Sequence, residues 1–178
     1  MEFGRLTASL SGKPFSGGFG PDSTVAAYNQ DVGQLQIEGG RRIGEWSEVV
    51  RLVMICDSIP ERGSYPIASQ LSPVSAGVYK TRLRRWLPRS GRTTTHFFIS
   101  DSMPQGVLNL DSLDLAAGII RGRFSVGVRT FNQKPADTLF VTGAFSGRVR
   151  TTRRMASTRP IRWTPLQGRD CKGVKTRE

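Results

Sequence analysis

The sequence predicts an all-β fold, an antiparallel β-sandwich or flattened barrel of roughly ten short strands. Three observations predict it. Apolar and polar residues alternate with a period of two, no stretch keeps a helical period, and 20 Gly and 10 Pro supply frequent turns. With 178 residues, 37% of them hydrophobic, the chain is long enough for one domain with a real core.

The expected strands follow one another along the chain with turn residues between them. Residues 49–56 are β-branched and almost continuously apolar, which is typical of a strand covered on both faces. Gly39-Gly40, Pro60, Pro73 and Pro88 are among the residues that mark the turns. The remaining early candidates are residues 4–9, 24–29, 34–38, 64–68, 77–83, 93–99 and 106–110.

The clearest strands are residues 119–129 and 139–149. In the first, Ile120, Phe124 and Val126 alternate with Arg121, Arg123 and Ser125, so one face is apolar and the other is wet. The polar stretch 132–137 between the two strands predicts a hairpin with a long loop. Gly122-Arg123-Phe124 and Gly143-Ala144-Phe145 echo each other, which indicates similar packing across the two strands rather than a duplicated unit.

The alternating pattern ends after Val149, so the sequence predicts a β-sandwich domain over residues 1–149 and a basic extended tail over residues 150–178. The tail alone cannot bury enough apolar area to offset its ordering entropy. The apolar runs are all shorter than the roughly 18 to 20 residues that a membrane-spanning helix needs.

The net charge of +12 is concentrated in two segments. Residues 148–178 hold ten Lys and Arg against two acids, and residues 78–92 hold six and no acid, whereas the rest of the chain is close to neutral. Each segment also places Trp beside Arg, and these two side chains suit an interface because Arg binds phosphate or carboxylate and Trp fills apolar recesses. The predicted partner-binding residues are Arg82, Arg84, Arg85, Trp86, Arg148, Arg150, Arg153, Arg154, Arg159, Arg162 and Trp163. The competing interpretation is a solvated charged surface with no specific partner.

Catalytic and metal-binding patterns are weak by comparison. His96 has no nucleophile elbow to serve, and an ordinary strand histidine is the better interpretation. Asp111 and Asp114 lack calcium-loop spacing, so we interpret them as loop and turn acids. One His and two Cys do not supply a usual zinc set, and no cofactor is expected. A bridge between Cys56 and Cys171 would fix the tail to the core in an oxidising compartment, but their spacing leaves the pairing open.

Residues 119–125 and 137–145 resemble the closing hairpin of small β-rich bacterial envelope lipoproteins whose domain has no assigned function. Thr7-Ala8 before Gly12-Lys13-Pro14-Phe15 resembles their opening strand and turn, and Gly63-Ser64-Tyr65-Pro66-Ile67 is similar to their mid-chain step. The sequence has no apolar signal segment or lipobox Cys ahead of Phe3, and residues 78–92 and the tail look like additions to the family pattern. A basic, non-catalytic sandwich is also similar to the membrane-extrinsic polypeptides that brace a photosynthetic reaction centre inside its light-harvesting ring.

These observations together predict a non-enzymatic, membrane-extrinsic structural subunit that docks onto a larger membrane protein assembly through its Arg and Trp segments. Its partners would be membrane-complex subunits and anionic lipid headgroups, at the periplasmic or envelope side of a membrane, with the cytoplasmic face as the other location. The alternatives are a basic nucleic-acid-binding protein and, third, a hydrolase built on a β-sandwich.

Overall fold

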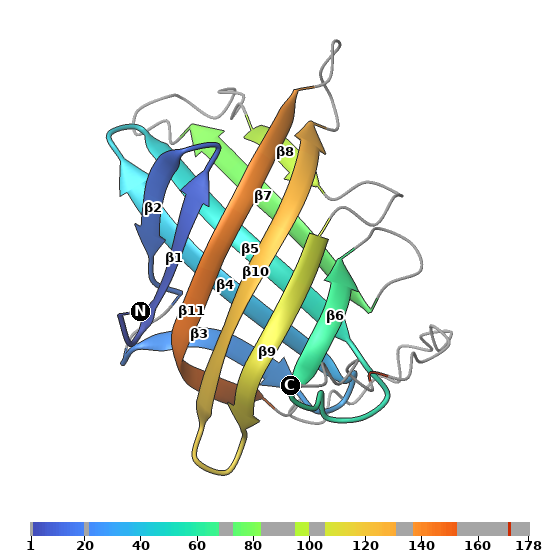
Figure 1. The fold of residues 1–178 in the computed structure, drawn as a ribbon. Helices are drawn as coiled ribbons and strands as arrows, with labels where there is room; N and C mark the ends of the chain where they lie inside the picture. Colours follow the sequence, from blue (N-terminus) through green and yellow to red (C-terminus); the bar gives the residue numbers. More distant parts are fainter. Residues whose placement is uncertain are drawn as a thin grey trace, which may run out of the picture.

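The computed structural model describes residues 2–19, 22–67, 73–82, 95–99, 106–130, 137–152 and Cys171. All regular structure in these residues is β-strand, and none of them form a helix long and apolar enough to cross a bilayer. Eleven strands follow one another along the chain (Figure 1). They are β1 (Arg5–Leu10), β2 (Lys13–Gly17), β3 (Thr24–Asn29), β4 (Gln34–Ile43), β5 (Trp46–Ile55), β6 (Gly63–Ile67), β7 (Val74–Arg82), β8 (Thr95–Ile99), β9 (Gly106–Asp114), β10 (Ile119–Thr130) and β11 (Thr138–Thr152).

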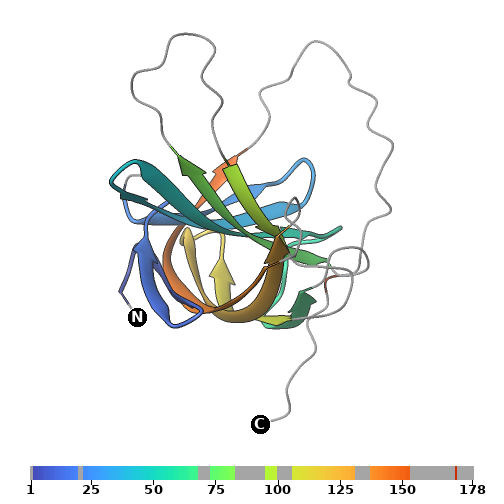
Figure 2. The same cartoon turned by 90° about the horizontal axis from the view of Figure 1, so that it is seen from above.

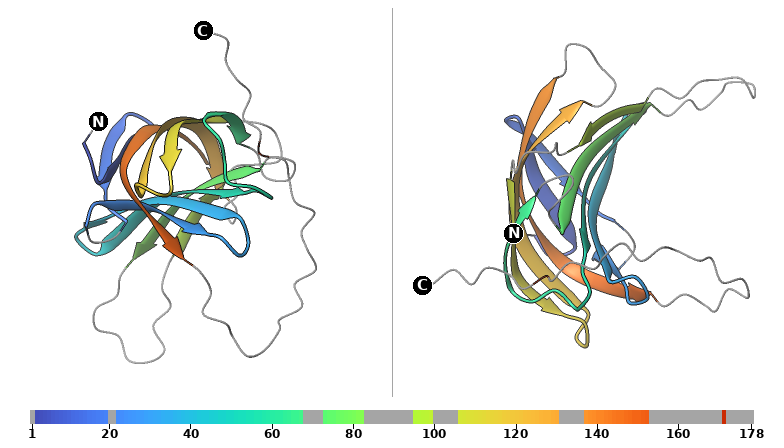
Figure 3. Two further views of the ribbon diagram at one scale, coloured as in Figure 1. Left: turned by 90° about the horizontal axis from the view of Figure 1, so that it is seen from below. Right: turned by 90° about the vertical axis from the view of Figure 1, so that its right-hand side faces the viewer.

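All eleven strands belong to one sheet, and this sheet closes on itself. Going round, β10 pairs with β11, then β3, β4, β5, β7, β6 and β9 follow, and β9 pairs again with β10. Every pairing is antiparallel except those of β11 with β3 and of β6 with β7. Seen from above and from the side, the strands form two curved layers that face each other (Figures 2 and 3).

The two ends of the closed sheet are built from different strands. We call the end at which β4 turns into β5 the upper end, and the end at which β9 turns into β10 the lower end (Figure 1). One edge of β11 pairs with β1 over residues 141–146 and then with β3 over residues 148–152. The edge of β10 that faces away from β11 likewise pairs with two strands, with β9 at the lower end and with β8 at the upper end. The long strands β10 and β11 therefore run from one end of the sheet to the other, and each pairs with two shorter strands in succession along its outer edge.

The core lies between the two layers and is formed by the inward residues of nearly every strand. In β10, buried residues alternate with exposed ones, as the sequence predicts. The largest fully buried side chains include Tyr65, Phe145, Leu6, Ile37 and Met54. In β5, buried residues alternate with half-buried ones, so the outer face of this strand is partly open instead of fully covered.

A reciprocal glycine–phenylalanine arrangement joins β10 to β11. Gly122 lies opposite Phe145, and Phe124 lies opposite Gly143. A Cβ added to Gly122 would come within 2.5 Å of the Phe145 ring, and one added to Gly143 would come within 2.7 Å of the Phe124 ring. Each ring thus covers the glycine of the other strand, which confirms the similar cross-strand packing expected from the sequence.

The all-β, mostly antiparallel class is confirmed, but the described residues form one closed sheet and not the two separate sheets of a sandwich. Several elements also differ from the predicted ranges. β2 is an additional strand, β4 continues through Gly39-Gly40 to Ile43, β9 continues past Leu110 to Asp114, and β11 continues past Val149 to Thr152.

Candidate docking face

Four arginines form a basic strip on the outer face of β10 and β11. We give this name to Arg121 and Arg123 on β10 with Arg148 and Arg150 on β11, all of them exposed. Arg121 lies opposite Ser146, and Arg148 follows two residues later on the same face. Diagonal neighbours of this kind are about 7–8 Å apart, within the reach of long side chains. The two strands together carry five arginines and no acid.

The guanidinium groups of this strip are nearly free of acidic partners. Arg123 lies 3.5 Å from Asp111, in a pair whose arginine side chain is 67% exposed. Arg121, Arg148 and Arg150 form no side-chain hydrogen bond or ion pair with the part of the chain that the structure describes. Ile119, opposite Arg148, is 42% exposed. The strip therefore offers charge-assisted hydrogen-bond donors beside an apolar side chain.

The other layer of the sheet pairs its cations with acids. Arg41 donates two hydrogen bonds to Glu48 Oε2, at 2.9 and 2.7 Å, and Lys80 Nζ lies 3.2 Å from Glu48 Oε1. Arg51 pairs with Glu38 at 2.6 Å and lies over the ring of Tyr79. Burial alone would raise the pKa of Glu48, but the hydrogen bonds and charges of Arg41 and Lys80 outweigh it and lower that pKa. Arg41, Arg51 and Lys80 therefore already have acidic partners within the chain.

Two of the eleven predicted site residues, Arg148 and Arg150, belong to the basic strip. Arg82 ends β7 at the upper end, where its backbone pairs with Trp46. Across the sheet, Arg150 is level with Ala27 on β3, Gln36 on β4 and Val53 on β5. Val53 and Trp46, the partner of Arg82, are roughly 23 Å apart along β5. The structure therefore does not bring Arg82 and the basic strip together. The other predicted residues, Arg84, Arg85, Trp86, Arg153, Arg154, Arg159, Arg162 and Trp163, lie outside the described residues.

Arg121 and Arg123 are not among the binding residues predicted from the sequence. Their alternation with Ile120, Gly122 and Phe124 already predicts that they lie on the solvent-exposed face of the strand. The missing information was the register, because Arg121 and Arg148 lie 27 positions apart in the sequence and share a surface only when β10 pairs with β11. A search for clusters along the sequence finds the tail and overlooks a cluster that forms across strands.

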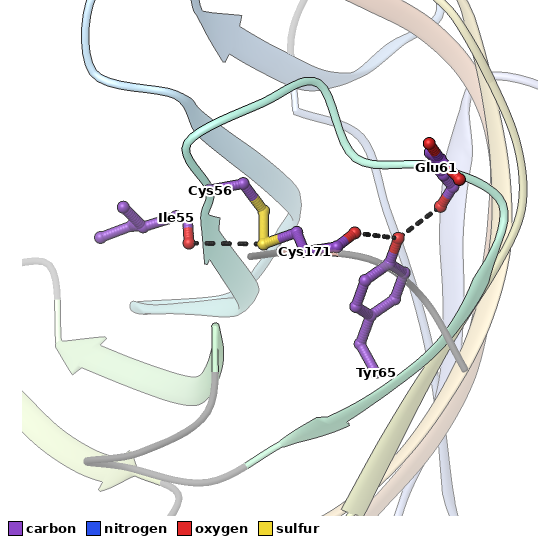
Figure 4. Close-up of a disulfide and its surroundings, with 5 residues drawn as sticks. All are labelled: Ile55, Cys56, Glu61, Tyr65 and Cys171. Carbon is purple, nitrogen blue, oxygen red and sulfur yellow. Dashed lines mark hydrogen bonds between the residues drawn. A yellow bond between two sulfur atoms is a disulfide. The ribbon is translucent and has the colours of Figure 1, made fainter. Parts of the chain in front are cut away.

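A disulfide between Cys56 and Cys171 answers the question that the sequence left open. The two Cα atoms are 5.5 Å apart and both residues are buried. Figure 4 shows the bridge beside Tyr65, whose hydroxyl has two acceptors, the carbonyl oxygens of Glu61 at 2.5 Å and Cys171 at 3.1 Å. Cys171 is thus bound to the lower end of the sheet. At the same end the carbonyl of Thr152, the last residue of β11, accepts a hydrogen bond from the Gln30 amide.

The remaining candidates for chemistry are dispersed. His96 is in β8, where its backbone pairs with Lys80. Asp111 and Asp114 are in strand β9 and not in a loop as expected, although Asp114 accepts a hydrogen bond from the Ala117 amide at the following turn. Within the described ranges, no three His, Cys, Asp or Glu residues gather as a metal site would require.

Comparisons of the chain with protein-family models, with curated proteins and with solved structures found no match. The resemblance to envelope lipoproteins and the photosynthetic assignment therefore stay predictions.

Proposed function

We propose that this protein is a non-catalytic, membrane-extrinsic docking subunit, which binds an acidic surface of a larger membrane-bound assembly through its basic strip. The observation that carries the proposal is the basic strip, in which Arg121, Arg148 and Arg150 are exposed and have no acidic partner among the described residues, while neither β10 nor β11 carries an acid. Like charges placed close together destabilise a sheet. A surface that keeps them unpaired is suited to a partner that supplies the missing acids.

The strip is also well organised for binding. Arg121, Arg123 and Arg148 project from a ladder of eleven residue pairs, and Arg150 follows in the pairing of β11 with β3, so their spacing is fixed before a partner arrives. Arginine forms two parallel hydrogen bonds to a carboxylate or phosphate, and a fixed platform reduces the entropy lost on association. The closed, flattened sheet serves in this proposal as a rigid scaffold, with the sandwich-like layers as its two faces.

The disulfide supports a location in an oxidising compartment, because such bonds persist in the periplasm and outside the cell and are rare in the cytosol. We therefore place the protein on the periplasmic or envelope side of the membrane. A photosynthetic reaction centre with its antenna ring stays our sequence-based prediction for the assembly.

The test is co-purification from gently solubilised membranes across a salt series. The variant Arg121→Gln, Arg148→Gln, Arg150→Gln should elute at lower salt, with an affinity at least about tenfold weaker, because three charge-assisted contacts are lost. The matched control Lys13→Gln, Arg42→Gln, Arg129→Gln removes the same charge from exposed positions at the upper half of the sheet and should bind like the wild type.

Equal weakening of both variants would mean that only the net charge matters and would refute the strip as the docking face. Recovery with DNA or RNA instead of membrane subunits, with binding lost after nuclease treatment, would replace the proposal with the nucleic-acid alternative.

A further inference from the structure

A cavity of about 500 Å³ lies beside the basic strip, between the start of β1, the end of β2 and β4. One of its walls is formed by residues 2–5, next to the end of the chain marked N in Figure 1. Its polar walls include Glu2, Arg5, Ser16, Ser23 and Arg41. Its size is within the range of small-ligand sites.

The cavity adjoins the basic strip through the register of the sheet. Arg5 lies opposite Ser146 on β11, and Ser146 lies opposite Arg121 on β10. One row across three strands therefore connects the cavity to the strip. A partner that covers the strip and extends along this row would reach Arg5.

Two arginines line the cavity, and one of them is held rigidly. Arg41 is fixed by Glu48, by the carbonyl oxygen of Pro14 at 2.7 Å and by the ring of Phe15, whose centroid is 4.8 Å from Cζ. Arg5 is held more loosely, by Glu2 at 3.2 Å and by the Ser16 hydroxyl at 3.4 Å. Arg5 is thus the cation that can exchange its partner.

Glu2 shows which chemical group this arginine accepts. Its carboxylate lines the cavity and pairs with Arg5, and their side chains are 63% and 50% exposed. Exposed ion pairs of this kind contribute little to stability. A carboxylate that arrives from outside can therefore replace Glu2 on Arg5 at small cost.

Of the two adjacent glycines in the cavity wall, Gly18 leaves room for such a group. Gly17 must be glycine, because an added Cβ would come within 2.6 Å of the Gly40 carbonyl oxygen. Gly18 has no such constraint, since an added Cβ would meet only the Gly4 carbonyl oxygen, at 3.9 Å. A side chain at residue 18 would enter open space at the cavity wall, and glycine keeps that space empty.

We propose that this cavity binds a carboxylate, which Arg5 accepts in exchange for Glu2. The inference rests on the proposed function in one respect, namely that the carboxylate is expected to belong to an acidic side chain of the docking partner. A free dicarboxylate has the same chemistry and is the other source.

The experiment measures binding of two probes, glutarate and a blocked hexaglutamate peptide, by calorimetry and by amide chemical shifts of the cavity residues. Glu2→Gln should bind both about two- to fivefold more tightly, because the internal competitor is removed. Gly18→Val should bind both at least about tenfold more weakly, because its side chain occupies the cavity. Asp31→Asn is the control, since it removes one acid at the turn between β3 and β4 and should leave both affinities unchanged.

The outcomes separate the cavity from the strip. The strip variant Arg121→Gln, Arg148→Gln, Arg150→Gln should weaken the peptide and leave glutarate unaffected. Tight binding of glutarate with weak binding of the peptide would assign the cavity to a free dicarboxylate, even if no membrane partner is found. If Glu2→Gln binds both probes with unchanged affinity, the inference is wrong, whether or not Gly18→Val folds. The proposed function is tested separately, by the co-purification from membranes.

Discussion

Glu48 shows how single residues shape the upper end of the sheet. Arg41, Glu48 and Lys80 are paired with one another across β4, β5 and β7. They lie on the same face of these strands as the core residues. Glu48 is the one charged residue among the buried side chains of the described chain. Its carboxylate is stabilised by two cations, and losing it would leave both without their acid.

The pH dependence of stability follows from this arrangement. The pKa of Glu48 is lowered in the folded protein, so its contribution is complete above the unfolded value of 4.5 and is lost as pH falls through the folded value. Glu48→Gln should lower the free energy of unfolding by about 2 kcal/mol at pH 7. The difference from the wild type should shrink as pH falls from 4.5 through the lowered pKa of Glu48. Urea unfolding at pH 7 and pH 3 measures both values, and a difference that stays constant would contradict the role of the carboxylate.

At the scale of elements, short-range patterns predicted where strands occur, and tertiary contacts decided where they end. The candidate 24–29 agrees with β3 at both ends. Gly39-Gly40 looked like a turn, yet β4 continues because its residues pair with β5 as far as Ile43. Gly39 serves packing instead, since an added Cβ would come within 2.7 Å of Leu6 Cβ on β1. β11 continues past Val149 because its last residues pair with β3, far away in the sequence. Neither contact can be read from the local pattern.

The glycine–phenylalanine pairs of β10 and β11 give a prediction at the same scale. Gly143→Ala should lower the free energy of unfolding by about 2 kcal/mol or more, because the methyl group would clash with Phe124 and with the Thr7 carbonyl oxygen at 2.6 Å. Ser125→Ala, on the exposed face of β10, should change it by less than about 0.5 kcal/mol. Thermal unfolding compares the two variants. Equal stability of Gly143→Ala and the wild type would mean that the rings do not confine the glycines.

At the scale of the whole molecule, the sequence predicted the all-β class and left open whether the strands form a sandwich or close into a flattened barrel. Closure depends on pairings between distant segments, such as β9 with β6 and β11 with β3. The same limit applies to the docking face. Arg148 and Arg150 were predicted from charge density along the chain, whereas Arg121 joins them only through strand register. The proposed docking face is therefore a rigid sheet face, whereas the sequence alone pointed to two basic segments, residues 78–92 and 148–178.

The disulfide is a covalent cross-link between residues 115 positions apart. In the chain-entropy model, closing a loop of this length removes about 4–5 kcal/mol of disorder from the unfolded state. The variant Cys56→Ala, Cys171→Ala should therefore be less stable by about 4 kcal/mol. Guanidinium unfolding of the oxidised wild type and of the variant gives this difference directly. The wild type unfolded with a dithiol reductant present is the internal control, because it should match the variant. If oxidised and reduced wild type unfold at the same denaturant concentration, the bridge does not stabilise the fold, and the argument for an oxidising compartment loses its basis.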